Sequence, residues 1–355
     1  MSGHKIRLAA DIGGTFTDLA LALPDGIATA KHLTTPQAPE LGVLSGVREL
    51  LAQTGVSASD IEVMVHGTTL ATNALIERRG AKTALVVTAG LRDSVEMAQE
   101  NRFAQYDISS NRPKPLVPRY LRWEVEERLN WRGEVLTELD EDSVRALLPR
   151  IRAEGIESLA IGLIHAYANP AHERQVADII RAEFPNLSLS LASEVCPEVR
   201  EYERQSTTCA NAYVQPVMSG YLGRLREGLD ELGVSCDMLM MSSGGTLMGL
   251  DAARRFPIRL VESGPAGGAI LAAQIAEEES LKSVLSFDMG GTTAKICMID
   301  NATPLTSRSF EVAREYRFMR GSGLPVRVPV IEMVEIGAGG GSLASVDELG
   351  RIAVG

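Results

Sequence analysis

Two short segments of this chain share one pattern, an aspartate followed by a Gly-Gly-Thr turn, and this repetition constrains the fold more than any other feature. The segments are Asp11-Ile12-Gly13-Gly14-Thr15 and Asp288-Met289-Gly290-Gly291-Thr292. Each lies between two apolar runs, which predicts a strand, a tight turn and a second strand. Glycines let backbone N–H groups approach an anion, and an acidic residue at a strand end can hold a divalent cation. The repeat therefore predicts two related half-sites that close on one polyphosphate.

Paired turns of this kind resemble the phosphate loops of acetate and sugar kinases, heat-shock chaperone ATPases and actin. The resemblance implies an α/β fold with two ribonuclease-H-like (actin-like ATPase) domains facing a central cleft that holds ATP and Mg²⁺. Strands and helices alternate through residues 61–191, which indicates a mostly parallel sheet. The competing interpretation is two unrelated hairpins, because Gly-Gly turns between strands are common.

Composition narrows the class of protein and its partners. A chain of 355 residues is long enough for two domains with separate cores. The formal net charge of −11 argues against nucleic acid as the main partner, because phosphate neutralisation requires Lys and Arg. No apolar run reaches membrane-spanning length, and no signal-peptide pattern precedes the first strand. The four cysteines lack Cys-x-x-Cys spacing, so they are expected to be free thiols of a cytoplasmic protein. No membrane partner is expected.

The helical patterns in the second half of the chain suggest how the domains are divided. A long helical pattern runs from Tyr202 toward Leu232, and Pro216 is expected to kink or split it. A boundary near residues 190–200 predicts domains 1–192 and 193–355, each with one Gly-rich turn. A further helix over residues 264–278 is lined by Ala and Gly. In the superfamily such a helix crosses between the domains; an ordinary tightly packed helix is the alternative.

Six segments in order along the chain resemble the hydantoinase A / 5-oxoprolinase family, which includes N-methylhydantoinase and the acetone carboxylase β subunit. They are DIGGTFTD (11–18), HGTTLATN (66–73), REYER (200–204), SGPAGG (263–268), FDMGGTT (287–293) and IGAGGGS (336–342). The resemblance implies an ATP-dependent hydrolase that opens a cyclic amide, such as a hydantoin, an N-methylhydantoin or 5-oxoproline, by phosphorylating the amide carbonyl oxygen. It also implies a hydantoinase B-type subunit, and hence a hetero-oligomer. Family members usually run to nearly twice this length, so the second domain is expected to be incomplete at its C-terminus.

The matching motifs supply the candidate site residues. Asp11 and Asp288 are expected to be catalytic and to position Mg²⁺, directly or through water. Nucleotide contacts are expected from Gly13, Gly14, Thr15, Thr17, Gly290, Gly291, Thr292, Thr293, Gly339 and Gly340. Lys295, at the start of the strand after the second turn, would reach a phosphate or simply be a solvated edge lysine.

A second candidate group begins with His66, at the end of a predicted strand and before a predicted helix. His66 is expected to act as an acid or base and to contact substrate together with Thr68, Thr69 and Asn73, because strand ends and helix N-termini bind ligands in α/β sheets. The alternative is a structural role in which the two threonines cap the following helix.

Two other functions stay open. One is an ATP-dependent carboxylase β subunit acting on an acetone-type ketone, and the other is a nucleotide-driven conformational switch like actin or the chaperone ATPases. The three functions differ in what stimulates ATP turnover: a cyclic amide, a ketone with bicarbonate, or neither.

Overall fold

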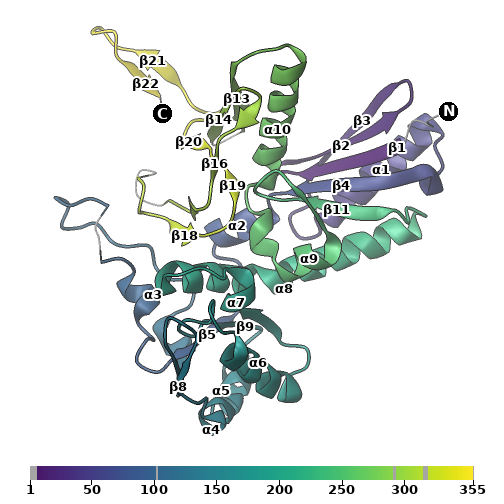
Figure 1. Cartoon of the computed structure of the whole chain (residues 1–355). Helices are drawn as coiled ribbons and strands as arrows, with labels where there is room; N and C mark the ends of the chain where they lie inside the picture. Colours follow the sequence, from purple (N-terminus) through teal and green to yellow (C-terminus); the bar gives the residue numbers. More distant parts are fainter. Residues whose placement is uncertain (1–5, 101–102, 291–292, 315–318, 355) are drawn as a thin grey trace.

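The computed structural model of the protein describes residues 6–100, 103–290, 293–314 and 319–354. This part of the chain contains an N-terminal sheet, a separate lobe, and a sheet from the C-terminal third (Figure 1). Two of the predicted nucleotide contacts, Gly291 and Thr292, lie outside the described residues.

The N-terminal sheet has the strand order β12-β11-β4-β1-β2-β3. Its strands are β1 (Ile6–Ile12), β2 (Phe16–Leu23), β3 (Gly26–Leu33), β4 (Ile61–Thr68), β11 (Asp237–Met241) and β12 (Leu247–Gly249). The first three strands form an antiparallel meander, and β4 and β11 extend the sheet parallel to β1. The order from β3 to β11 is that of a ribonuclease-H-like domain, as the paired turns predicted.

Buried and exposed residues alternate along β1, and this alternation shows which face of the sheet is covered. Leu8, Ala10 and Ile12 are buried in a core shared with the helices α1 (Glu40–Thr54) and α8 (Glu201–Glu231). The residues between them point to the opposite face and stay exposed. Asp11, the candidate site residue of β1, therefore lies on the side of the sheet that these helices leave open.

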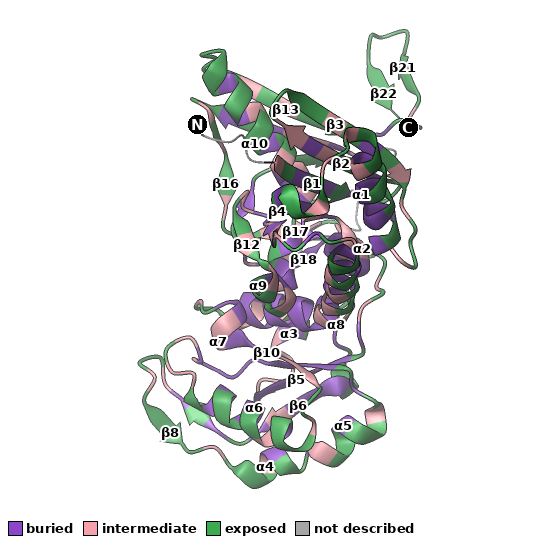
Figure 2. Cartoon of the chain, turned by 90° about the vertical axis from the view of Figure 1, so that its right-hand side faces the viewer, coloured by how far each residue is buried: buried purple, intermediate pink, exposed green. Residues whose placement is uncertain are grey.

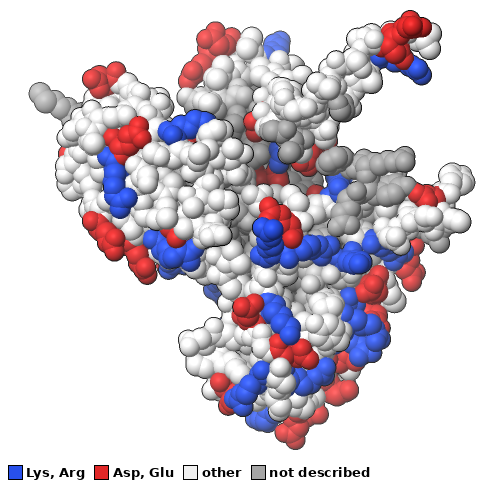
Figure 3. Space-filling view, turned by 180° about the vertical axis from the view of Figure 1, so that it is seen from behind, with Lys and Arg blue, Asp and Glu red and all other residues white. Residues whose placement is uncertain are grey.

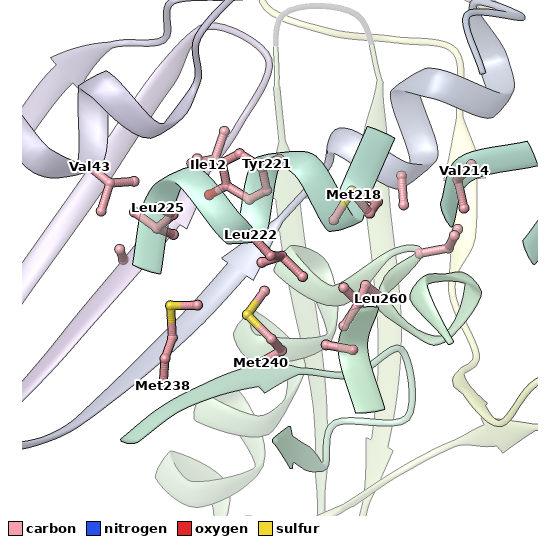
Figure 4. Packing of buried hydrophobic residues seen from close by; sticks show 14 of the residues in the cluster. Ile12, Val43, Val214, Met218, Tyr221, Leu222, Leu225, Met238, Met240 and Leu260 are labelled. Atoms are coloured by element: carbon pink, nitrogen blue, oxygen red, sulfur yellow. The ribbon is translucent and has the colours of Figure 1, made fainter. Parts of the chain in front are cut away.

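Figure 4 shows how α8 completes this core. Tyr221, Leu222 and Leu225 extend from α8 toward the sheet, where Met238 and Met240 of β11 project into the same cluster. All five side chains are at most 4% exposed. Burying these five apolar side chains contributes more to stability than the secondary-structure propensity of any one segment. The packing on α8 therefore fixes the position of β11 beside β4.

Residues between the two parts of the N-terminal sheet form the lobe, a parallel sheet of order β10-β9-β5-β6. Its elements are β5 (Thr83–Thr88), α3 (Ser94–Met97), β6 (Arg122–Val125), β7 (Arg128–Leu129), β8 (Val135–Thr137), α4 (Glu141–Arg145), α5 (Leu148–Glu154), β9 (Ser158–Ile161), α6 (Ala171–Glu183), β10 (Ser188–Leu191) and α7 (Ala192–Val195). Exposed residues lie along the outer faces of α4, α5 and α6 in Figure 2, and the central strands are buried. The parallel sheet predicted from strand–helix alternation is confirmed here.

The predicted domain boundary at residues 192/193 does not coincide with a boundary between sheets. β11 follows that point in the chain but pairs with β4, which precedes it. The N-terminal sheet is thus built from both sides of the predicted boundary, and residues 83–191 are an insertion within it. Long-range strand pairing of this kind leaves no local mark in the sequence.

The split that Pro216 predicted in the long helix does not occur, because α8 runs from Glu201 to Glu231 through the proline. Proline removes one backbone donor and crowds the preceding turn, which costs about 3 kcal/mol in a helix interior. The helix continues because its buried side chains pack on the lobe toward one end and on the N-terminal sheet toward the other.

The C-terminal sheet repeats the opening of the first. β13 (Ser283–Met289), β14 (Ala294–Asp300) and β15 (Thr303–Pro304) form an antiparallel meander, and β20 (Val334–Ile336) pairs with β14. One face packs on the alanines of α10 (Ser263–Glu278). The other face exposes Leu285, Phe287 and Met298. Within the described ranges, this meander is the part of the second ribonuclease-H-like domain that the chain provides.

Short elements complete the molecule. They are α2 (Leu70–Ile76), α9 (Leu250–Arg255), the pairs β16 (Thr306–Ser307) with β19 (Val330–Ile331) and β17 (Phe310–Val312) with β18 (Leu324–Val326), and the exposed hairpin β21 (Ala344–Val346) with β22 (Ile352–Val354). No helix among the described residues is long and apolar enough to cross a membrane. On the face seen in Figure 3, basic and acidic side chains are interspersed over the lobe, so their charges largely offset one another.

The segment that connects α2 to β5 packs closely against α8 at Gly80, and a mutation can test this contact. A Cβ atom on Gly80 would lie 2.5 Å from the backbone oxygen of Tyr213 and 2.2 Å from its ring. We expect Gly80→Ala to lower the free energy of unfolding by about 1–3 kcal/mol, because backbone atoms must move apart. Gly249→Ala is the matched control, since no atom lies within 4 Å of its added Cβ. Equal urea midpoints for the two variants would contradict this expectation.

Candidate active site between the two glycine-rich turns

The first Gly-rich turn joins β1 to β2. The antiparallel register places Asp11 directly opposite Asp18. The Gly13 N–H donates to the Phe16 carbonyl at 2.9 Å, and the Thr34 hydroxyl donates to the Gly13 carbonyl at 2.9 Å. These bonds hold the turn at both of its ends and leave its tip, at Gly14 and Thr15, exposed.

The second turn joins β13 to β14 and repeats this geometry. Asp288 lies opposite Lys295, and the Gly290 N–H donates to the Thr293 carbonyl at 2.9 Å, the same three-residue span as in the first turn. The third Gly-rich segment also reaches this point, because the Gly340 N–H donates to the Gly290 carbonyl at 3.0 Å. Gly339 lies beside it in a turn closed by Ser342. Two of the three predicted Gly-rich segments are therefore in direct contact.

The Asp11 carboxylate lies where three chain segments meet. A Cβ on Gly67 of β4 would stand 2.7 Å from one of its oxygens, and a Cβ on Gly264 of α10 would stand 3.4 Å from both. Asp11 keeps access to solvent on the open face of the sheet, but partial desolvation by these neighbours raises its pKa, and the negative charges of Asp18 and Asp288 raise it further. The charge of Asp288 thus reaches Asp11, as expected if both turns face a common gap.

A cleft of about 810 Å³ opens beside this carboxylate, over the uncovered face of the N-terminal sheet. Asp11, Asp18, Gly67, Ser263 and Gly264 line its polar end. Mostly apolar residues of the strands, the Gly267–Gly268 stretch of α10 and the charged side chains of Lys31 and Glu49 line the rest. Glycine and alanine walls keep this space open between the sheet and α10.

The acidic groups at the polar end fit a hard cation bound through water. Within the described ranges, no three His, Cys, Asp or Glu side chains come close enough together to bind a metal ion directly. Burial is the main cause of the raised pKa of Asp11, and the carboxylates of Asp18 and Asp288 add repulsion that a cation would relieve. Mg²⁺ prefers oxygen ligands and usually keeps several of its waters. The residues present therefore suit Mg²⁺ held partly through water.

His66 does not face the cleft, which corrects the expectation that it contacts substrate. The side chain is fully buried, and its Nδ1 lies 2.9 Å from the carbonyl oxygen of Ala10. Because a carbonyl can only accept, Nδ1 carries the proton, and Nε2 accepts from the Tyr221 hydroxyl at 2.5 Å. Burial lowers the pKa of His66 to about 4. In this arrangement His66 positions the backbone immediately before Asp11.

Thr17 also points away from the cleft, contrary to its predicted contact with nucleotide. Its side chain is fully buried on the α1 face of the sheet, where its hydroxyl lies 3.0 Å from that of Thr34. A one-residue step along a strand changes the face, so Thr17 and Asp18 necessarily point to opposite sides. Thr17 therefore supports the first turn from behind.

The residues after His66 connect the first turn to α2 and α10. The buried Thr68 accepts from the Leu70 N–H through its hydroxyl at 3.2 Å, which is the capping alternative considered for it. The Thr69 hydroxyl donates to the Ile12 carbonyl at 3.1 Å, and the Asn73 amide donates to Thr69 at 3.3 Å. Thr69 and Asn73 are half-buried next to the first turn, so they brace it and stay candidates for ligand contact.

Sequence reasoning missed three residues that the structure brings to the site. Asp18 belongs to the first motif, and the strand–turn–strand pattern would have placed it across from Asp11. Ser263 is buried, and its hydroxyl bonds both the N–H and the carbonyl of Thr68, at 3.3 and 3.1 Å. Gly264 follows it against Asp11. Both open the SGPAGG segment that the sequence singled out, but only the long-range contact of α10 with β4 places them at the site.

The buried imidazole predicts a pH dependence of stability. The folded pKa of His66, about 4, lies below its ordinary 6.5, so the unfolded chain binds this proton first as the pH falls. The stabilisation is complete above pH 6.5 and is lost as the pH falls toward 4, on the order of 3 kcal/mol in total. We expect urea unfolding of His66→Gln to show a shallower loss across this window. Tyr221→Phe, which keeps the imidazole, should retain the wild-type slope; identical slopes for wild type and His66→Gln would refute the assignment.

Comparison with protein families places the whole arrangement among known proteins. The family model "Hydantoinase/oxoprolinase N-terminal region" matches residues 7–184, and the model "Hydantoinase/oxoprolinase" matches residues 204–355. Caprolactamase subunit alpha of Pseudomonas jessenii is 32% identical over 362 residues, which span 100% of this chain and 51% of that protein. The 5-oxoprolinase of Saccharomyces cerevisiae is 29% identical across 97% of this chain and 29% of its own length.

Solved structures agree with these matches. A nucleotide-free structure of acetone carboxylase, from work on ATP-dependent carboxylation, has a TM-score of 0.84 at 27% identity and covers 99% of this chain and 51% of that one. The ATP-dependent caprolactamase of Pseudomonas jessenii also reaches 0.84, at 32% identity, covering 98% and 50%. The chain thus spans about half the length of these relatives. The paired turns, the ribonuclease-H-like sheet order and both family matches together mean that this chain belongs to the hydantoinase/oxoprolinase family, which has ATP-dependent enzymes among its members.

Proposed function

We propose that this chain is the ATP-using part of an enzyme that opens a cyclic amide of the hydantoin, N-methylhydantoin or 5-oxoproline class. The observation that carries the proposal is the shared geometry of two Gly-rich turns, each of which follows a strand that ends in an aspartate, Asp11 or Asp288. Two such turns offer backbone N–H groups to one polyphosphate from two sides.

In this proposal the turns bind and orient the phosphates. Gly14 and Thr15 would contact phosphate from the first turn and Thr293 from the second. Gly13, Gly290 and Gly340 donate their N–H groups within and between the turns and would hold them in shape, with Gly339 next to them. Asp11 and Asp288 would hold Mg²⁺ through its waters and orient the acceptor oxygen. Phosphoryl transfer asks mainly for such positioning and charge neutralisation, and little covalent chemistry from the protein.

When bound, ATP supplies a phosphoryl group that converts the amide carbonyl oxygen from a poor leaving group into a good one. The described residues then have two tasks, to align that oxygen and to exclude water from it. The alanines and glycines of the cleft beside Asp11 leave room for a small ring, and Lys31 and Glu49 in the lining offer charged partners to its polar groups. We assign the ring to this space, with its carbonyl directed at Asp11.

We also propose a partner subunit, because this chain would carry out only the phosphoryl transfer and another subunit the hydrolytic step. The relatives include a protein named as a subunit, caprolactamase subunit alpha. No cluster of metal ligands suited to a separate hydrolytic step is found in the described residues. A phosphorylated amide is labile in water, so we propose that a hydantoinase B-type subunit in a hetero-oligomer receives it across a closed interface.

An acetone-type ketone carboxylase is the second candidate. Acetone carboxylase matches the fold as well as caprolactamase does, with the same TM-score of 0.84. The same phosphate site would then activate a ketone and bicarbonate. A pure nucleotide switch is the third reading, and it uses the turns without small-molecule chemistry.

Stimulation of ATP turnover separates these functions. We expect the full-length protein with its partner to hydrolyse ATP faster when a hydantoin, an N-methylhydantoin, 5-oxoproline or caprolactam is added. Stimulation by acetone with bicarbonate alone would favour the carboxylase, and a slow rate that no compound changes would favour the switch. Complete amide turnover at full rate by the isolated full-length chain would rule out the proposed division of labour.

Asp288 should matter more for turnover than for folding. Asp288→Asn keeps the shape and removes the charge, and we expect ATP turnover to fall by about 10²–10³-fold, as for loss of one preorganised electrostatic group. Asp25→Asn, in the exposed turn between β2 and β3, is the matched control and should keep the wild-type rate. Thermal unfolding of both variants checks that the fold is intact. Wild-type turnover by Asp288→Asn would remove this residue from the mechanism.

A further inference from the structure

An ion pair joins the two halves of the site. The ammonium group of Lys295, on β14, donates to the carboxylate of Glu262, the residue that immediately precedes α10. The two side chains are 17% and 22% exposed. At this degree of burial, an ion pair is screened less than one on the open surface.

Glu262 is attached to the N-terminal sheet through its own backbone and its neighbour. Its N–H donates to the hydroxyl of Thr72 in α2 at 3.1 Å. The next residue, Ser263, bonds the backbone of Thr68 at the end of β4. Glu262 itself adopts φ 63° and ψ 23°, the left-handed region that residues with a Cβ rarely occupy. Backbone strain of this kind gathers at functional sites, where surrounding contacts maintain it.

Lys295 belongs to the other half. It lies directly opposite Asp288 on β13, and it is also the cross-strand partner of Glu335 on β20. Asp288 and Lys295 occupy the positions of Asp11 and Asp18 in the first turn, seven residues apart in each case. The first turn therefore presents two carboxylates, whereas the second presents one carboxylate and one ammonium.

This difference between the two turns matters for the balance of charge around Asp11. Asp11 lies near the carboxylates of Asp18 and Asp288, and the Asp18 charge is offset by Lys31 at 2.7 Å. Lys295 is thus the ammonium group that the second turn brings to the edge of this cleft, because its partner Glu262 immediately precedes Ser263 and Gly264 of the cleft lining. A polyphosphate entering this cleft needs cationic partners, and charge-assisted bonds are the strong ones.

We propose that Lys295 is a phosphate-binding residue of the cleft and that Glu262 is the residue that positions it, from the N-terminal half. The inference rests on the proposed use of ATP, but not on which amide or ketone is the substrate. Glu262 keeps the lysine directed at the junction between the turns and away from open solvent. It also ties the second turn to the end of β4, so that both turns are in register before the nucleotide arrives.

The test is equilibrium binding of a fluorescent ATP analogue, with Mg²⁺, to the full-length protein. We expect Lys295→Gln to weaken binding by about 10- to 100-fold, the usual effect of losing a hydrogen bond to a charged group. Lys295→Arg, which keeps the charge, should restore most of the affinity. Glu262→Gln should weaken binding by about threefold or more, although it removes a negative charge, because Lys295 loses its fixed position. In the Lys295→Gln background, Glu262→Gln should weaken binding no further.

Lys82→Gln and Glu154→Gln are the matched controls. They break an ion pair of the same chemistry, at 3.2 Å, on the exposed surface of the lobe, and they should leave nucleotide affinity unchanged. Thermal unfolding of each variant separates loss of binding from loss of fold.

The outcomes separate this inference from the proposed function. Unchanged affinity in Lys295→Gln would overturn the inference while leaving ATP use intact. Tighter binding by Glu262→Gln would mean that Glu262 competes with phosphate, which also overturns the positioning role. A wild-type protein that binds no nucleotide would overturn the proposed function, and the inference with it.

Discussion

Three chain segments meet at the Asp11 carboxylate, and glycine in two of them makes the meeting possible. Gly67 in β4 and Gly264 at the start of α10 leave the space that side chains would otherwise fill. A methyl group at Gly67 would stand 2.7 Å from a carboxylate oxygen, which is closer than non-bonded atoms approach. The same meeting brings α10, and with it the second turn, against the N-terminal sheet. The geometry of the whole cleft therefore depends on this contact.

Buried hydrogen bonds hold that meeting point from behind. Ser263 satisfies both backbone groups of Thr68, and His66 connects the Ala10 carbonyl to the Tyr221 hydroxyl on α8. Leaving any of these groups unpaired in the interior would cost about 1–3 kcal/mol each. Polar networks that are fully satisfied define one arrangement, whereas apolar packing alone tolerates several. These hydrogen bonds explain why His66, although it belongs to one of the family motifs, supports the backbone beneath the site.

The charges around the cleft follow from strand register. Antiparallel pairing places Asp18 opposite Asp11 and Lys295 opposite Asp288. The first turn is consequently acidic, and the second carries both signs. Burial raises the pKa of Asp11, the charges of Asp18 and Asp288 raise it further, and an incoming cation would relieve their repulsion. A site of this kind accepts a polyphosphate only together with positive charge.

The sequence by itself determined the local parts of this protein. Turn chemistry located both Gly-rich turns, and hydrophobic patterns located the strands beside them, the strand–helix alternation of residues 61–191 and the helices α8 and α10, because these features depend on neighbours within a few residues. Tertiary structure alone decided the rest. It carried α8 through Pro216, joined β11 to β4, turned His66 and Thr17 into the interior, and set Glu262 against Lys295. Each of these outcomes depends on the face or partner that a residue meets across long sequence distances, and a residue type or motif specifies neither.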